Sequence, residues 1–372
     1  MTDTTTTPTT TTTTLPAPPP HILTTQAHGR RMLSGIQPSG DLHLGNHFGA
    51  IAQFVEAQHH NEIFIFIANL HAMTTVRDGA ALRRSTTDVA LDYLALGLDP
   101  SKVTLYRQHD LPWVPLLAWV LNCLTPVGDL ERSVTYKDKV AKGLQPNAGL
   151  LTYPVLMAAD ILAVNAEVVP VGQDQITHVE LARRCASRFN EAYGVQLFVE
   201  PLAQVNNART VPGLDGAKMS KSYGNTIPIF ATPDEYRRLV MAIKTDSLPV
   251  EAVKDPATCN AYALLSLVAD AAELADWAAR YRAGGLRYSA VKSRLLELLL
   301  AHFGPAMERR RALQARPWEV EEALRAGAQR AAQVSRPLME RLLDLVGLDP
   351  SGLWGPAGSV REMARPVRGW GS

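Results

Sequence analysis

Two short segments far apart in the chain carry residues suited to binding one polyphosphate. The first, SGIQPSGDLHLGN at 34–46, combines a glycine-rich stretch with polar side chains. It indicates a strand end, a turn and a helix start, where free backbone N–H groups attract an anion. The second, AKMSKS at 217–222, places Lys218 and Lys221 in a loop between two glycines. These lysines can neutralise a leaving pyrophosphate, and the glycines allow the loop to close.

Each segment also has a simpler interpretation. A glycine-rich strand–helix turn capped by Asn46 needs no ligand, and a lone glycine pattern is a weak signal. A loop with two lysines is commonly a solvated basic loop. Their presence in one chain, in this order, favours the interpretation in which both segments contact one nucleotide.

Two carboxylates between these segments are further candidates. Asp160 ends an apolar stretch at 151–161, which indicates an apolar slot with one buried acceptor at its base. The alternative is that Asp160 caps a helix or pairs with an arginine. Asp174 lies in GQDQ at 172–175, a strand-to-helix turn of the kind where α/β proteins bind ligands. Capping that helix is the alternative for Asp174.

The elements around these residues alternate between strand and helix. We predict strands at 30–35, 62–70, 102–106 and 168–172, and helices at 46–59, 80–96 and 173–193. This order predicts an α/β fold with a doubly wound parallel sheet, a Rossmann-type nucleotide-binding domain. After Pro233 the strand patterns end, and stretches rich in Ala, Leu, Glu and Arg predict a C-terminal all-helical domain.

Composition divides the chain into four predicted parts. Residues 1–27 are rich in threonine and proline, which predicts a disordered tail. Residues 28–232 form the catalytic domain, which ends in the loop that carries Lys218 and Lys221 (217–222, called the lysine loop below). Residues 233–347 form the helical domain, and 348–372 form a Gly/Pro-rich tail.

Charge and cysteine usage limit the classes of partner and cofactor. The formal net charge is +1, so a nucleic acid would have to be held by a local basic patch. The three cysteines (Cys123, Cys185 and Cys259) are scattered, which argues against a zinc site, an Fe–S cluster or a disulfide framework and favours a reducing cytosol. No apolar run approaches the roughly 18 residues of a membrane span, so we expect no membrane partner.

A series of blocks resembles the bacterial tryptophanyl-tRNA synthetases, which are class I aminoacyl-tRNA synthetases with HIGH and KMSKS signatures. The blocks are SGIQPSGDLHLGN (34–46), LHAMT (70–74), LER (130–132) with YKDK (136–139), GLLTYPVLMAADIL (149–162), VPVGQDQITHVELARRCASRFN (169–190) and AKMSKS (217–222). The resemblance runs from about 31 to 347. The MAAD and VGxDQxxH blocks together separate it from the tyrosine enzymes, which recognise a phenol hydroxyl.

This resemblance implies a tryptophan–tRNA ligase. Such an enzyme activates L-tryptophan with ATP to tryptophanyl-adenylate and pyrophosphate, then transfers tryptophan to the 3′ end of tRNA(Trp). The resemblance also implies Mg²⁺ held mainly by the ATP phosphates, no protein metal site, an anticodon-binding role for the helical domain, a homodimer and a cytoplasmic location.

The resemblance further implies roles for individual residues. The implied ATP contacts are Gln37, His43, Gly45, Asn46, Asp174, Lys218, Met219, Ser220 and Lys221, and the implied catalytic residues are His43, Lys139, Lys218 and Lys221. The implied tryptophan contacts are Leu33, Ser34, His71, Tyr153, Met157, Asp160, Val169, Val171 and Gln175. Asp160 would accept the indole N–H.

The chain departs from the family's usual residues near the expected pocket. Leu33 replaces an aromatic residue, Asn69-Leu70 stands where Asp-Gln is usual, Thr135 stands at a position that is often Gln, and Gln173 replaces a Glu. We interpret these changes as those of a divergent copy with relaxed selectivity for substituted tryptophans.

Two surface predictions concern assembly and tRNA binding. The segment 113–121 contains more apolar and aromatic residues than one helix beside a sheet would bury, which predicts a symmetric interface, with a core helix as the alternative. Arg309, Arg310 and Arg311 form one of the few basic clusters, a candidate anticodon contact, with a solvated helix face as the alternative.

Two other functions would share parts of this pattern. A synthetase-like binding or regulatory protein would have no reason to retain both Lys218 and Lys221. A HIGH-type nucleotidyltransferase acting on a small metabolite would not need the helical region after Pro233.

Overall fold

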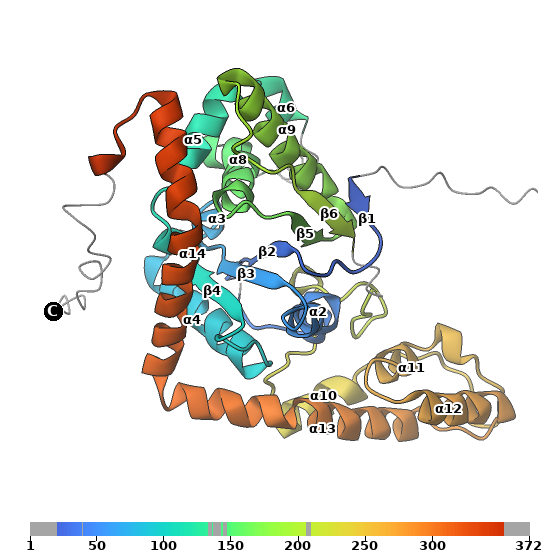
Figure 1. Cartoon of the computed structure of the whole chain (residues 1–372). Helices are drawn as coiled ribbons and strands as arrows, with labels where there is room; N and C mark the ends of the chain where they lie inside the picture. Colours follow the sequence, from blue (N-terminus) through green and yellow to red (C-terminus); the bar gives the residue numbers. More distant parts are fainter. Residues whose placement is uncertain are drawn as a thin grey trace, which may run out of the picture.

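A single parallel sheet forms the centre of the molecule. The computed structural model describes residues 21–38, 40–132, 136, 143, 147–205 and 210–352. Within these ranges the strands run in the order β1-β6-β5-β2-β3-β4, all parallel (Figure 1). They are β1 (Ile22–Leu23), β2 (Arg31–Ile36), β3 (Glu62–Ile67), β4 (Val103–Arg107), β5 (Val168–Val171) and β6 (Leu202–Val205). The predicted doubly wound, Rossmann-type sheet is confirmed.

Helices alternate with the strands and then continue alone. The α-helices of the described residues are α1 (Leu44–Asn46), α2 (Ala52–Ala57), α3 (Asn69–Ala72), α4 (Gly79–Ala95), α5 (Val114–Leu124), α6 (Val127–Glu131), α8 (Ala148–Ala163), α9 (Ile176–Tyr193), α10 (Pro233–Met241), α11 (Asn260–Leu265), α12 (Ala271–Ala283), α13 (Tyr288–Gln314) and α14 (Pro317–Val346). A π-helical turn, His47–Ile51, joins α1 to α2. None of these helices is both long and apolar enough to cross a membrane.

The sheet separates two apolar layers. On β3, Ile63, Ile65 and Ile67 face one layer, whereas Phe64 and Phe66 face the other. Successive side chains of a strand point to opposite faces, and both faces of β3 are covered, which explains its near-continuous apolar sequence. Helices α2, α4 and α13 contribute to the first layer, α5, α8 and α9 contribute to the second, and α14 contributes to both (Figure 1).

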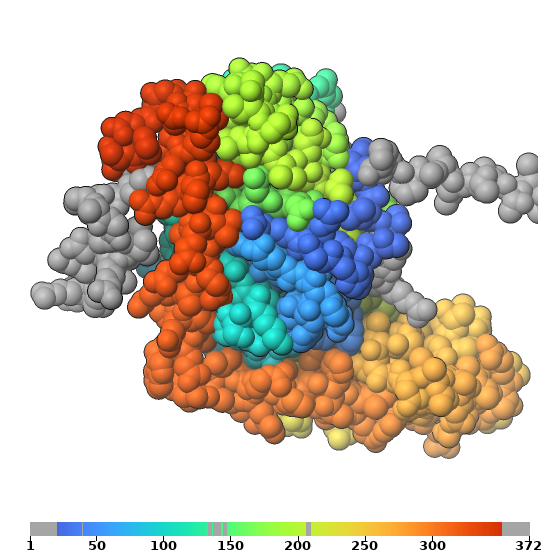
Figure 2. Space-filling model, viewed as in Figure 1, coloured from blue at the N-terminus to red at the C-terminus, as the bar shows by residue number. Residues whose placement is uncertain are grey.

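The last long helix returns to the sheet and covers the open edge of β4. A Cβ atom at Gly327 of α14 would lie 1.8 Å from the carbonyl oxygen of Leu105, so only glycine permits this approach. Nearby, Arg330 donates to the carbonyls of Pro100 and Val103 at 2.7 and 2.9 Å. An uncovered edge strand is a template for aggregation, and α14 removes that exposure along the side of the molecule (Figure 2).

The helical region extends away from the sheet. Helices α10 to α13 follow the lysine loop, and α11 and α12 project beyond the body of the molecule (Figures 1 and 2). Helix α13 lies along α4 and connects this projection to α14.

Two predicted boundaries differ from the structure. The tail predicted at 1–27 is too long, because Ile22 and Leu23 form β1 and pair with β6. Residues 1–20 and 353–372, predicted as parts of the tails, lie outside the described residues. The helical domain predicted at 233–347 includes α14, which packs on the sheet. A pattern of helical residues does not specify which surface the helix contacts.

The structure shows which residues of the two predicted surfaces are buried or bonded within the chain, whereas the homodimer and the anticodon contact stay predictions. In 113–121, Trp113, Leu117 and Leu121 are buried in the second layer, so the core-helix alternative holds for most of this segment, and Trp119 is 67% exposed. Arg310 donates to Asp92 at 2.6 Å and lies over the Phe230 ring at 4.8 Å. Arg309 donates to the carbonyl of Ala95. These two arginines therefore fasten α13 to α4.

Candidate active site

The turn of the first signature segment (34–46), called the nucleotide turn below, lies at the carboxyl end of β2, next to β5. Strand order reverses here, because the chain continues from β2 to β3 on one side while β5 pairs on the other. Such a switch point is where open α/β sheets bind ligands. After Ile36 the chain turns through Gly40, whose φ of +75° suits glycine, and enters α1.

His43 and Asn46 stabilise the start of α1. The side-chain oxygen of Asn46 accepts the backbone N–H of His43 at 3.0 Å. The His43 ring is buried, and its Nδ1 has no hydrogen-bond partner in the part of the chain that the structure describes. Burial, and then the nearby charge of Lys221, lower the pKa of His43 from 6.5 to about 4. At neutral pH His43 therefore presents a neutral imidazole.

The lysine loop packs directly on this turn. The sulfur of Met219 lies 3.4 Å from the backbone nitrogen of Gly45, and a Cβ atom at Gly45 would lie 3.4 Å from the Met219 Cβ. Lys221 Nζ comes within 3.9 Å of the corresponding position at Gly40. Residues 227–229, which follow the loop, bond to the backbone of 42–44. The structure therefore brings the two segments together, as the sequence predicted.

Asp160 is the centre of a buried polar network. Its carboxylate accepts from His71 Nε2 at 3.0 Å and from Gln108 Nε2 at 2.8 and 3.1 Å. Gln108 in turn accepts the backbone N–H groups of Leu70 and His71. Burial raises the pKa of Asp160, while His71 and Gln108 oppose that rise. The network presents a fixed acceptor next to apolar side chains.

Several of the other predicted tryptophan contacts belong to the second apolar layer, and Tyr153 contacts His71. Leu33, Val169 and Val171 are buried in the second apolar layer, and Met157 packs against it. The Tyr153 ring is 6.2 Å from that of His71, edge to face, and its hydroxyl bonds His178 Nε2 at 2.7 Å.

The turn after β5 carries the remaining candidates. Asp174 is exposed and accepts from Gln175 Nε2 at 3.1 Å. The helix predicted from 173 begins as a 3₁₀ turn at Gln173–Gln175, and α9 starts at Ile176. Gln37 is exposed beyond β2, and Ser34 is half-buried within it. Lys139 and Thr135 lie outside the described residues, so their predicted places stay predictions.

Two polar residues of this site have no signature in the sequence. Gln108 follows β4 and joins Asp160 to the start of α3. Asn225 is 3% exposed and bonds to the lysine loop. Each is a single amide outside any recognised spacing, and only the folded structure reveals its partners.

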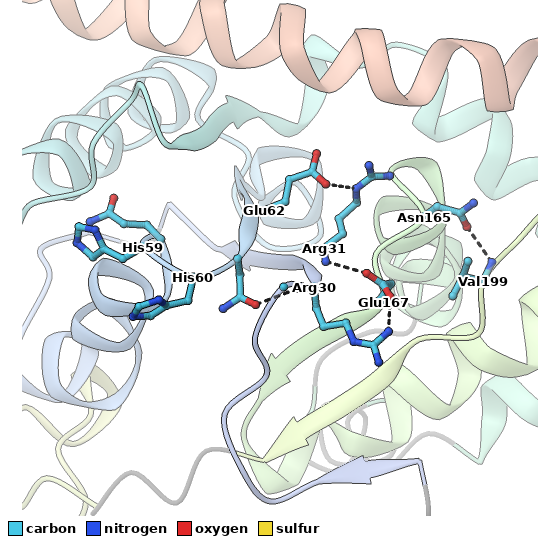
Figure 3. Close-up of a pocket in the computed structure, with 11 residues that line it drawn as sticks. Arg30, Arg31, His59, His60, Glu62, Asn165, Glu167 and Val199 are labelled. Atoms are coloured by element: carbon cyan, nitrogen blue, oxygen red, sulfur yellow. Dashed lines mark hydrogen bonds and ion pairs between the residues drawn. The ribbon is translucent and has the colours of Figure 1, made fainter.

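A groove of about 730 Å³ lies at the opposite, amino end of the strands (Figure 3). Its lining includes Arg30, Arg31, Glu62 and Glu167, together with His59, His60 and Asn165. Arg30 pairs with Glu167 at 2.6 Å and Arg31 pairs with Glu62 at 2.8 Å. The charged groups thus neutralise one another, and none of the predicted site residues that the structure describes lines this groove.

Comparison with known proteins identifies the family. The model of the class I tRNA synthetases (W and Y) matches residues 25–304. The chain is 48% identical over 319 residues to a tryptophan–tRNA ligase of Rhodopirellula baltica, covering 86% of this chain and 99% of the relative. It is 46% identical over 323 residues to that of Fusobacterium nucleatum, covering 86% and 98%.

A solved structure agrees with this assignment. The crystal structure of tryptophanyl-tRNA synthetase from Campylobacter jejuni, complexed with ADP and tryptophan, superposes with a TM-score of 0.82 at 44% identity, covering 86% of this chain and 100% of that one. The fold, the paired signature segments and these similarities agree, and the chain belongs to the class I tRNA synthetases, in the family of the tryptophan–tRNA ligases.

Proposed function

We propose that this chain activates L-tryptophan with ATP and transfers it to tRNA(Trp). The observation that carries the proposal is the contact between Met219 and Gly45, because Met219 stands between Lys218 and Lys221 in the loop and Lys221 Nζ comes within 3.9 Å of the Cβ position at Gly40. The relatives are tryptophan–tRNA ligases, and the similar Campylobacter jejuni structure holds ADP and tryptophan. Both support the same substrates here.

The first step needs positioning and charge stabilisation. The tryptophan carboxylate is already a nucleophile: its oxygen attacks the α-phosphorus of ATP, a new P–O bond forms, and the bond to pyrophosphate breaks. No general base is required. Lys218 and Lys221 stabilise the charge that develops on pyrophosphate, as preorganised groups do in phosphoryl transfer. We assign Lys139 to the same task.

The turn and the strand ends would hold the nucleotide. His43, Gly45 and Asn46 line the start of α1, where backbone N–H groups favour phosphate oxygens. As a neutral donor, His43 can bond a phosphate or ribose oxygen without adding charge. Asp174 would place the ribose. Mg²⁺ usually keeps its contacts to substrate phosphates and water, so we assign it to ATP rather than to a protein site.

Asp160 would select tryptophan. Its carboxylate is held by His71 and Gln108, so it cannot turn away from the apolar side chains around it. An indole N–H would complete its hydrogen bonding, and a substrate that lacks this donor leaves the buried acceptor unpaired. Sites of this kind reject such analogues by about 10⁴–10⁵-fold. Leu33 in place of an aromatic residue supports relaxed selectivity for substituted indoles.

We assign tRNA binding to the helical region and assembly to the surface of α5. Helices α10 to α13 follow the lysine loop, so anticodon contacts there could influence activation. On α5, Trp119 is 67% exposed and Cys123 is also exposed, one turn further along the helix. A homodimer would cover this apolar strip.

Charging of tRNA tests the second step. Purified chain is incubated with radiolabelled tryptophan, ATP, Mg²⁺ and bacterial tRNA, and acid-stable counts on tRNA are measured. We expect charging to the level of the tRNA(Trp) present. Formation of adenylate without any charging would contradict the transfer step and favour a synthetase-like protein of another function.

A further inference from the structure

The buried amide of Asn225 supports the lysine loop from within. Its Oδ1 accepts the backbone N–H of Ser220 at 2.8 Å. Its Nδ2 donates to the carbonyl oxygen of Lys218 at 3.2 Å and to Oδ1 of Asp215 at 2.7 Å. Ser220 and Lys218 flank Met219, the residue that contacts Gly45. One side chain therefore fixes the backbone on both sides of the point where the loop meets the nucleotide turn.

The surroundings of Asn225 are shaped to hold this amide. A Cβ atom at Gly213 would lie 2.3 Å from the Asn225 side chain, so a larger residue there would displace it. Gly213 and Val211 also pair with the loop, through bonds to Ala217 at 2.7 Å and to Met219 at 2.9 Å. The loop is thus a short antiparallel pair with Asn225 closing its end.

Asp215 completes the arrangement. Its Oδ1 accepts both the Asn225 amide and the backbone N–H of Ala217, at 2.7 and 3.1 Å. These bonds lower the pKa of Asp215, so it stays an ionised acceptor at neutral pH. Every polar atom of the Asn225 amide group therefore has a partner inside the loop.

We propose that Asn225 is a positioning residue for activation, which sets the backbone of Lys218 and Lys221 so that both ammonium groups reach the departing pyrophosphate. The inference rests on the proposed function and deepens it. Lysine side chains are flexible, so the place of each ammonium group depends on the backbone that carries it. A shift of about 1 Å in a positioning element can lower a rate about 100-fold.

The first test compares two buried asparagines. In Asn225→Ala, we expect kcat for tryptophan-dependent pyrophosphate exchange to fall about 100-fold while the KM for tryptophan stays unchanged. Asn190 is the matched control: it is 6% exposed and bonds the backbone of Leu197 and Phe198 at 2.8–3.1 Å, away from the loop. We expect Asn190→Ala to lower the melting temperature and to leave kcat per folded enzyme unchanged.

The second test exchanges the two partners. Asn225→Asp places two carboxylates at the 2.7 Å contact and should lower kcat as Asn225→Ala does. Adding Asp215→Asn removes the repulsion between the two carboxylates, whereas the contacts to the Lys218 carbonyl and the Ala217 N–H stay mismatched. We therefore expect the double variant to recover part of the lost kcat, roughly tenfold over Asn225→Asp. Such recovery measures the pair itself, because a general loss of stability would not be reversed by a second change.

The outcomes separate this inference from the proposed function. Normal kcat in Asn225→Ala, an equal fall in Asn190→Ala, or no recovery in the double variant overturns the positioning role while leaving tryptophan activation intact. A wild-type chain without tryptophan-dependent exchange overturns both.

Discussion

The backbone nitrogen of Gly45 lies 3.4 Å from the sulfur of Met219, a residue 174 positions further along the chain. A Cβ atom at position 45 would crowd the His43 ring at 3.0 Å and contact the Met219 Cβ at 3.4 Å. The contact holds the loop of Lys218 and Lys221 against the turn to which we assign phosphate binding. We therefore expect a change in the loop to act on the proposed nucleotide site.

Replacing Lys218 and Lys221 with alanine should slow adenylate formation far more than it weakens tryptophan binding. Their charge matters most as pyrophosphate departs, so the loss falls on the transition state. We expect a fall of about 10²–10³-fold for each lysine, similar to the loss of one preorganised donor. Rapid-quench measurement of adenylate formation checks this. Lys102→Ala, at the amino end of β4, is the control, and a normal rate with a raised tryptophan KM would contradict the assignment.

Asp160→Ala should weaken selection for tryptophan while ATP binding survives. The lost hydrogen bond to a charged acceptor is worth about 1.5–3 kcal/mol. His71 and Gln108 also lose their partner in this variant, so stability should fall as well. Asp160→Asn keeps an acceptor oxygen and separates the two effects. Tryptophan affinity measured by calorimetry decides the matter: an unchanged value in both variants would show that the carboxylate serves only the fold.

Much of the sheet could be predicted from local patterns, and its edges could not. The apolar run at 62–70 gives a strand at Glu62–Ile67, because a strand buried on both faces needs such residues throughout. Its last residues turn into α3 instead. Strand β1 has only two residues, and β6 contains the polar Gln204 within its four, so neither shows the continuous apolar run that marked β5. Their positions depend on pairing across the chain, which local sequence does not record.

In the site, residues in motifs were predictable and residues that support them were not. His43, Gly45 and Met219 meet as the paired signatures implied. Gln108 contacts residues that are distant in the sequence, and Asn225 contacts backbone groups of the lysine loop. A single amide residue belongs to no sequence motif, so neither contact can be predicted from the sequence. The same limit explains Arg310, whose charged neighbours in the sequence suggested RNA and whose partner in the fold is Asp92.

Arg310→Ala should destabilise the fold, and Arg311→Ala should not. Arg310 is the ion-pair partner of Asp92, which is 4% exposed, and removing one member of a buried pair costs about 3 kcal/mol. Arg311 is exposed, and a change there should stay within about 0.5 kcal/mol. Thermal unfolding compares the two. Unchanged melting of Arg310→Ala with lost tRNA charging would instead restore the anticodon role of this cluster.

Acid should destabilise the chain partly through His47, which follows the nucleotide turn. Burial, and then His302, lower the pKa of His47 from 6.5 to about 4. The folded-state pKa is below the unfolded one, so the stabilisation is full above pH 6.5 and is lost as pH falls toward 4. This contribution of His47 to the free energy of unfolding amounts to about 3 kcal/mol.

The variant His47→Gln tests this pH dependence. The free energy of unfolding is measured by denaturant titration between pH 5 and pH 7, in steps. Near pH 5, unfolding of the variant should take up about one proton fewer than unfolding of the wild type. Equal slopes against pH would show that His47 does not contribute.

Pyrophosphate exchange measured separately with each of the twenty amino acids tests the central claim most directly. The chain is supplied with ATP, Mg²⁺ and labelled pyrophosphate, and label entering ATP is followed. Our account predicts exchange with tryptophan and none with tyrosine, because Asp160 is assigned to the N–H on the side of an indole, a position that the para hydroxyl of tyrosine does not share. Exchange with tyrosine equal to that with tryptophan, or no exchange with any amino acid, would contradict it.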